Sequence, residues 1–151
     1  MTLFICRCLS RSLIELIADR YKDSTGFIIL GKNISYPVAL EGALKLNELT
    51  YLGCMGFPSA ELKHGPIALI DKTRPVIILA PKDSFKDKII NAIHEVKARN
   101  GIVILISSYP KGDSVEGLAD HVVRVPDTHQ LLSPIMMAIP LQLFAYYLAV
   151  S

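Results

Sequence analysis

The sequence predicts one α/β domain with three layers, in which a flavodoxin-like parallel sheet is flanked by helices. Two observations support this prediction. Short runs of apolar, mostly β-branched residues have no polar face, and helical spans separate them, which is the pattern of parallel strands covered on both sides. The chain of 151 residues, 51% of them hydrophobic, can also bury a core of its own.

The strands are expected in these apolar runs, and we expect about four or five of them in one sheet. The clearest runs lie at residues 26–30, 75–80, 102–106 and 121–125. Residues 53–58 are expected to be irregular. Residues 59–65 are expected to form a short helical turn, which a Gly-Pro pair then stops.

The helices are expected where apolar residues recur at helical spacing. They lie at residues 9–21, 37–51, 83–100 and 133–150. Pro37 suits the first turn of the second helix, because its missing N–H has no partner there, and Ser35 or Asn33 can act as the N-cap. Ser10 can cap the first helix, and Gly101 ends the third.

Composition and charge exclude several classes of function. The net charge is +2, with basic residues interleaved among acidic ones, so the sequence lacks the basic stripe that nucleic acid requires. Cys6, Cys8 and Cys54 are an odd number of cysteines without a repeated spacing, which indicates free thiols in a reducing compartment. Residues 1–10 lack the long apolar region and cleavage site of a secretory signal. We therefore expect a cytoplasmic protein.

The last expected helix, residues 133–150, contains no charged residue. A membrane-spanning helix is one interpretation, since about 20 apolar residues cross a bilayer. Pro134, Pro140, Gln142 and the short length argue against it. A helix that is apolar all round is otherwise buried between layers or in a subunit interface. We expect a subunit interface and no membrane.

Three charged residues share one face of the second expected helix. Glu41, Lys45 and Glu48 follow one another at positions i, i+4 and i+7, so their side chains project together. One interpretation is a solvated face with weak ion pairs, and geometry alone favours it. The other is a carboxylate placed for proton transfer, with its charge tuned by the neighbouring lysine.

His64 is the histidine with the strongest functional claim. It precedes a Gly-Pro break on a loop, where polar functional groups are often presented, although a surface histidine or a hydrogen-bonded core histidine has the same pattern. The other histidines, His94, His121 and His129, have weaker claims. No two histidines have metal-ligand spacing, and the sequence has no glycine-rich phosphate loop, so we expect neither a metal nor a cofactor.

Two long motifs are more specific than the general pattern of an α/β domain. They are YPVALEGALKLNELTY at residues 36–51 and AELKHGPIALI at residues 60–70. Together they resemble the second sugar-isomerase (SIS) subdomain of the glucosamine-6-phosphate synthases, which are isomerising glutamine–fructose-6-phosphate aminotransferases. The similarity covers residues 17–150 and continues in order through residues 75–81, 94–99 and 134–146. Several long motifs in order are more specific than one short pattern.

This resemblance implies an SIS domain at residues 12–151, with residues 1–11 unmatched. It implies that Glu48 is the glutamate that moves a proton between the two sugar carbons. It also implies that His64 assists ring opening and reaches the active site of the neighbouring subunit of a dimer. Lys45 corresponds to a lysine of the active-site helix, and Glu41 shares its face, so both are expected to bind substrate. An enediol-type proton transfer needs one carboxylate near two adjacent carbons.

The resemblance also implies parts that these residues do not contain. A complete enzyme of this family has a glutaminase domain, and a first SIS subdomain whose Ser/Thr-rich loops bind the phosphate of fructose 6-phosphate. It also has a C-terminal tail whose lysine forms a Schiff base. We therefore expect a fragment that forms no glucosamine 6-phosphate alone, and that is a homodimer or associates with a chain supplying the first SIS subdomain. A non-catalytic phosphosugar-binding module and a gene remnant are the alternatives.

Overall fold

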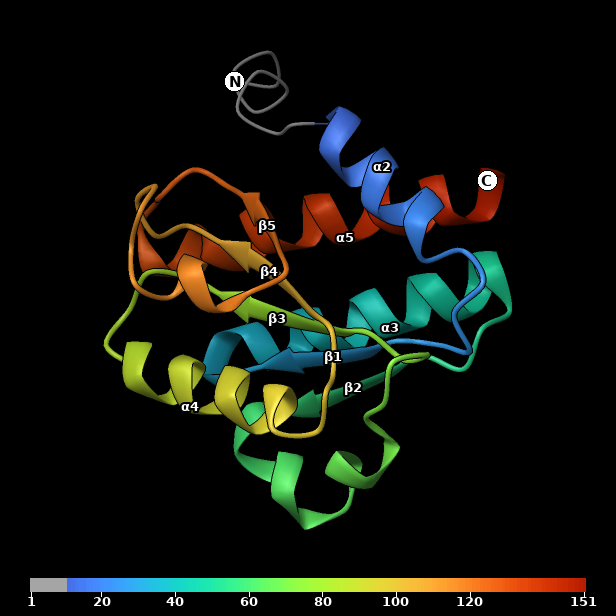
Figure 1. The fold of residues 1–151 in the computed structure, drawn as a ribbon. Helices are drawn as coiled ribbons and strands as arrows, with labels where there is room; N and C mark the ends of the chain where they lie inside the picture. Colours follow the sequence, from blue (N-terminus) through green and yellow to red (C-terminus); the bar gives the residue numbers. More distant parts are fainter. Residues whose placement is uncertain (1–10) are drawn as a thin grey trace.

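The computed structural model describes residues 11–151 and shows a central sheet between two helical layers (Figure 1). The strands of this sheet are β1 Ile28–Gly31, β2 Met55–Pro58, β3 Val76–Ala80, β4 Val103–Ser107 and β5 His121–Arg124. All neighbouring strands are parallel, in the order β2-β1-β3-β4-β5. This is the flavodoxin-like order, so the predicted fold class is confirmed.

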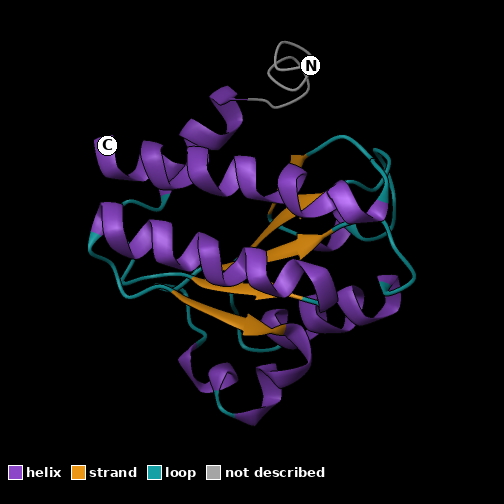
Figure 2. Ribbon diagram, turned by 180° about the vertical axis from the view of Figure 1, so that it is seen from behind, coloured by secondary structure: helices purple, strands orange, loops and turns teal. Residues whose placement is uncertain are grey.

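Helices cover both faces of the sheet. The α-helices are α2 Arg11–Arg20, α3 Tyr36–Thr50, α4 Lys86–Lys97 and α5 Ser133–Val150. The short 3-10 helices are η1 Asn33–Ser35, η2 Ser59–His64, η3 Pro66–Leu69, η4 Glu116–Leu118 and η5 Gln130–Leu132. Helices α2, α3 and α5 lie on one face (Figure 2), and α4 lies on the other with η2, η3 and η4.

Alternate residues of each central strand enter different cores, because side chains of a strand point to opposite faces in turn. In β3, Ile77 and Leu79 join the core under α3 and α5, whereas Val76 and Ile78 join the core under α4. Every residue of β1, β3 and β4 is buried. This double burial is the physical reason why these runs carry no polar face in the sequence.

Helices α3 and α5 pack closely side by side (Figure 2). The absence of a side chain at Gly42 allows this approach, because a Cβ there would lie 2.7 Å from Cδ1 of Leu141. Deeper in the same layer, the ring of Phe144 packs edge-on against Phe27, with 5.2 Å between the ring centroids. The inner side of α5 is therefore covered within the domain.

The outer side of α5 remains exposed and apolar, with Ile135, Tyr146 and Val150 more than half accessible. The segment Gln130–Val150 is long and apolar enough to cross a membrane by length and composition, a test that core helices of soluble proteins also pass. Because Phe144 and its neighbours are buried internally, the expected subunit interface is narrower than the whole helix and comprises at most its outer side.

The sequence-based expectations were wrong in three local details. Residues 53–58, expected to be irregular, include strand β2, which pairs with β1 from Ile28 opposite Met55 to Gly31 opposite Pro58. Helix α4 is shorter than expected at both ends. Ser35 occupies the N-cap position of α3, but its side chain makes no capping hydrogen bond, and its buried hydroxyl oxygen has no partner within residues 11–151.

The remaining predicted strands and helices are confirmed to within a few residues, and α5 spans residues 133–150 as expected. The expectations for Cys6, Cys8, the cap at Ser10 and most of the unmatched segment 1–11 lie outside the described residues.

Candidate functional site

Helix α3 presents its charged residues on the side that faces away from the sheet. Its first turn contains Pro37, and it ends where Tyr51 adopts a left-handed conformation that breaks the helical hydrogen-bond ladder. The inner side packs on the sheet and on α5 through small and apolar residues: Val38, Ala39, Gly42, Ala43 and Leu46. The helical repeat therefore directs Glu41, Lys45 and Glu48 outward together, as predicted.

The ammonium group of Lys45 lies between the two carboxylates of this face. Its Nζ donates a hydrogen bond of 2.8 Å to Oε2 of Glu48 and lies 3.9 Å from Oε1 of Glu41. The hydrogen bond and the charge of Glu48, with a smaller contribution from Glu41, raise the pKa of Lys45. Lys45 therefore stays protonated at neutral pH and restrains the Glu48 carboxylate.

This geometry fits proton transfer to a ligand bound outside α3. Half of the Glu48 side chain is exposed, so a ligand can reach it. Lys45 engages Oε2, and within residues 11–151 no hydrogen bond occupies Oε1. One carboxylate oxygen is therefore anchored while the other is free to accept a proton.

His64 lies at the end of η2, on the other side of the domain. Leu62 of the same turn is buried in the core under α4, and Gly65 follows His64 with φ of 134°, which ends the turn. The His64 ring is exposed, and it forms no hydrogen bond or ion pair with any of residues 11–151. Its anchored turn and free ring suit a contact with another molecule.

The structure brings Glu41, Lys45 and Glu48 together but does not bring His64 to them. Helix α3 belongs to the layer with α2 and α5, whereas η2 belongs to the layer with α4, and the sheet separates the two cores. Glu48 and His64 of one chain therefore face different surroundings. A site that uses both residues needs a further chain or domain.

The described residues contain no side-chain cluster of the kind that binds metal ions. Within residues 11–151, no three His, Cys, Asp or Glu side chains gather where they could hold a metal ion. Cys54 is a free and buried cysteine, and its burial raises the pKa of its thiol, which makes it a poor nucleophile.

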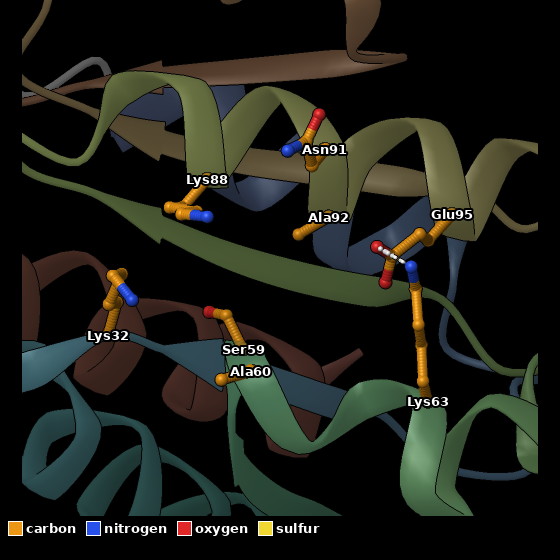
Figure 3. Close-up of a pocket in the computed structure, with 8 residues that line it drawn as sticks. All are labelled: Lys32, Ser59, Ala60, Lys63, Lys88, Asn91, Ala92 and Glu95. Atoms are coloured by element: carbon orange, nitrogen blue, oxygen red, sulfur yellow. Dashed lines mark ion pairs between the residues drawn. The ribbon is translucent and has the colours of Figure 1, made fainter.

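Sequence reasoning missed a group of residues between η2 and α4 that Figure 3 shows. A pocket there is lined by Lys32, Ser59, Ala60, Lys63, Lys88, Asn91, Ala92 and Glu95. These residues come from three separate segments, and only Ala60 and Lys63 belong to one of the two motifs described above. Lys32 and Ser59 directly follow strands β1 and β2. Ligands commonly bind at the carboxyl ends of parallel strands, and this position of Lys32 and Ser59 is the signal for the pocket. The sequence does not show it for Ser59, because residues 53–58 have no strand pattern.

The fold and these motifs define a class of protein. The model of the SIS domain family matches residues 21–151, and the chain belongs to this family. The matched region includes α3, η2 and the whole sheet, whereas α2 precedes it.

Among proteins of this family, the chain is similar to isomerising glutamine–fructose-6-phosphate aminotransferases. It is 43% identical to the enzyme of Aquifex aeolicus over 90% of this chain and 23% of that protein. It is 49% identical to the enzyme of Bacteroides thetaiotaomicron over 82% of this chain and 20% of that protein. The chain therefore spans about a fifth of the length of these relatives.

Solved structures agree with this similarity. The C-terminal domain of glucosamine-fructose-6-phosphate aminotransferase from Francisella tularensis superposes with a TM-score of 0.84 at 36% identity, covering 93% of this chain and 39% of that one. A putative sugar-phosphate isomerase from Listeria monocytogenes reaches a TM-score of 0.76 at 15% identity, covering 97% of this chain and 78% of that one. The second likeness shows the shared fold alone.

Proposed function

We propose that this chain is the second sugar-isomerase module of an isomerising glutamine–fructose-6-phosphate aminotransferase. In this role Glu48 transfers the proton between two adjacent carbons of fructose 6-phosphate, and Lys45 and Glu41 bind the substrate. The observation that carries the proposal is the 2.8 Å contact between Lys45 and Glu48 on an exposed helix face, within a region up to 49% identical to such enzymes.

The proposed chemistry follows from the restrained carboxylate. Isomerisation through an enediol removes a proton from one carbon and returns it to the next, so a single carboxylate within reach of both carbons is sufficient. Lys45 fixes the orientation of Glu48 through Oε2 and leaves Oε1 to take up and return the proton. Glu41, at the other side of Lys45, is placed to accept a hydrogen bond from a sugar hydroxyl.

We further propose that the working site is composite and cytoplasmic. Because His64 and Glu48 of one chain lie on different layers, His64 assists ring opening in a site whose Glu48 belongs to another copy. A homodimer, or an assembly with a chain that carries a first SIS module, would bring them together. In this proposal, the 151 residues alone are not sufficient for glucosamine 6-phosphate formation.

Two experiments test this proposal. The purified chain, supplied with fructose 6-phosphate and either glutamine or ammonia, is expected to form no glucosamine 6-phosphate, and turnover by the pure chain would refute the composite site. Calorimetry is expected to show only weak binding of fructose 6-phosphate by the isolated chain. Micromolar affinity would instead support a binding module without catalysis.

The catalytic roles are tested in a chimera, in which this module replaces the corresponding module of the Aquifex aeolicus enzyme. Glu48→Gln in the chimera is expected to lower kcat by about 100-fold or more, the usual contribution of a general base. Lys72→Gln, an exposed lysine on the turn before β3, is the matched control and is expected to leave kcat unchanged. Full activity of the Glu48→Gln chimera would exclude the proposed role of Glu48.

A further inference from the structure

The pocket between η2 and α4 lies across the sheet from the Glu48 face. It has a volume of about 370 Å³ and lies between Ser59 and Lys63 on one wall and Lys88 and Glu95 on the other (Figure 3). Lys32, just after β1, borders one end of it. Two alanines in the lining leave the space between these longer side chains open.

The lining of this pocket is strongly biased toward positive charge. It contains three lysines and one carboxylate, so the lining carries two more positive than negative charges. The carboxylate of Glu95 is already paired with Lys63, at 3.0 Å. Within residues 11–151, Lys32 and Lys88 form no ion pair. The ammonium of Lys32 lies over the ring of Phe85, 4.8 Å from the ring centroid.

The charges are distributed unevenly along the pocket, as Figure 3 shows. Lys32 and Lys88 extend from opposite walls at one end, with the hydroxyl of Ser59 beside them. The Lys63–Glu95 pair closes the other end, where it presents both a donor and an acceptor. One end therefore suits an anion, and the other suits neutral groups that donate and accept hydrogen bonds.

We propose that this pocket binds a small phosphorylated polyol. The phosphate lies between Lys32 and Lys88 and accepts a hydrogen bond from Ser59, and hydroxyl groups of the ligand contact Glu95 and Lys63. A phosphate monoester carries nearly two negative charges at neutral pH, which matches the two unpaired ammonium groups. The volume of about 370 Å³ admits a ligand of this size. The inference is independent of the catalytic role of Glu48, which lies on the other layer.

The test is a titration of the isotope-labelled chain, followed by backbone amide chemical shifts at constant ionic strength. Inorganic phosphate and glycerol 3-phosphate are expected to shift the amides of η2 and of the facing turns of α4 with millimolar dissociation constants, glycerol 3-phosphate binding more tightly. Lys32→Gln and Lys88→Gln are each expected to weaken both ligands by about tenfold. Lys72→Gln, an exposed lysine outside the pocket, is expected to change neither.

A second variant separates the phosphate from the polyol. Glu95→Gln keeps the size of the side chain but removes the charged acceptor, so glycerol 3-phosphate is expected to lose its advantage over inorganic phosphate. Shifts scattered over the surface, or an equal loss in Lys72→Gln and Lys32→Gln, would overturn the proposal in favour of unspecific charge attraction. Equal binding of the two ligands by the unmodified chain would overturn its polyol part.

Discussion

The two helical layers of this domain are attached to the sheet in different ways. In the α2–α3–α5 layer, contact is almost wholly apolar: α5 contains no charged residue and lies against Gly42, where an added Cβ would displace the side chain of Leu141. Ion pairs on this layer, such as those of Lys22 with Asp19 and of Lys45 with Glu48, join near neighbours in the sequence.

The α4 layer combines its apolar core with ion pairs between separate elements. Lys63 of η2 pairs with Glu95 of α4, and Lys86 of α4 pairs with Asp113 of the loop after β4. Other pairs tie β5 and its surroundings to this layer: Lys97–Asp120 and Glu116–Arg124. One layer therefore depends on close packing and exposes leucines, whereas the other depends partly on charge and offers a polar pocket.

The comparison predicts that a charge inserted into the packed layer is the most damaging change. Phe144→Asp places a carboxylate at a site that is 4% exposed, against Phe27, and is expected to lower the free energy of unfolding by several kcal/mol. Denaturant unfolding gives the measurement. Tyr146→Asp on the outer side of α5 is the control and is expected to lower it by less than about 1 kcal/mol. Equal stability of both variants would contradict the burial of Phe144 between α5 and the sheet.

The ion pairs of the other layer are expected to contribute less. Burial alone would raise the pKa of Glu116, but hydrogen bonds from Arg124 and from the N–H of Gly112 outweigh it and hold that pKa low. Glu116→Gln is therefore expected to lower the free energy of unfolding by about 1–2 kcal/mol, because the Arg124 side chain is partly solvated. Asp19→Asn, in an exposed pair, is expected to show no measurable change, and a larger loss there would contradict the comparison.

The exposed leucines of the packed layer predict self-association. Leu40 and Leu44 on α3 are 44% and 47% exposed, and Ile135, Tyr146 and Val150 on α5 are more than half exposed, so this helical layer presents several large apolar side chains to its surroundings. Large exposed apolar surface favours association. Sedimentation at micromolar concentration is expected to show a dimer, and Leu40→Glu with Leu44→Glu is expected to weaken it by more than tenfold. Leu69→Glu on the α4 layer is expected to leave it intact. A stable monomer would show that these apolar residues of α3 and α5 are exposed to solvent and form no dimer interface.

The smallest expected effect concerns a contact between the α2–α3–α5 layer and the sheet. The hydroxyl of Tyr21, after α2, lies 2.8 Å from Nε2 of His121 in β5. Burial, followed by the charge of Arg20, lowers the pKa of His121 against the opposing effect of Asp120. The unfolded chain then binds this proton more readily, so the stabilisation is complete above the unfolded pKa of about 6.5 and declines as pH falls through the folded value.

We therefore expect the free energy of unfolding of the unmodified chain to fall more than that of His121→Gln between pH 7.5 and pH 5. Denaturant unfolding at a series of pH values gives the measurement. Parallel pH profiles of the two proteins would show that titration of His121 does not affect the stability of the fold. Among the described residues, four carboxylates have a lowered pKa: Asp71, Asp113, Glu116 and Asp120. They lose their contribution to stability only below the ordinary carboxylate pKa of about 4, so they affect the range from pH 7.5 to pH 5 little.

The sequence by itself determined the fold class and most of its elements. Runs such as residues 75–80 are short, rich in β-branched residues and apolar at every position, which is typical of a strand buried on both faces. The helical repeat alone also grouped Glu41, Lys45 and Glu48 on one outward face, since residues three and four apart on a helix are neighbours whatever else surrounds them.

Tertiary structure alone decided the features that depend on residues distant in the chain. Strand β2 contains Gly56 and Pro58, which disfavour a strand locally, and it forms because β1 supplies hydrogen-bonding partners along one edge. His64 is separated from Glu48 because the sheet lies between their layers. The pocket between η2 and α4 forms because three segments that are separate in the sequence meet there. Local propensity acts over a few residues, whereas these arrangements depend on which faces are buried together, and only the packed chain specifies that.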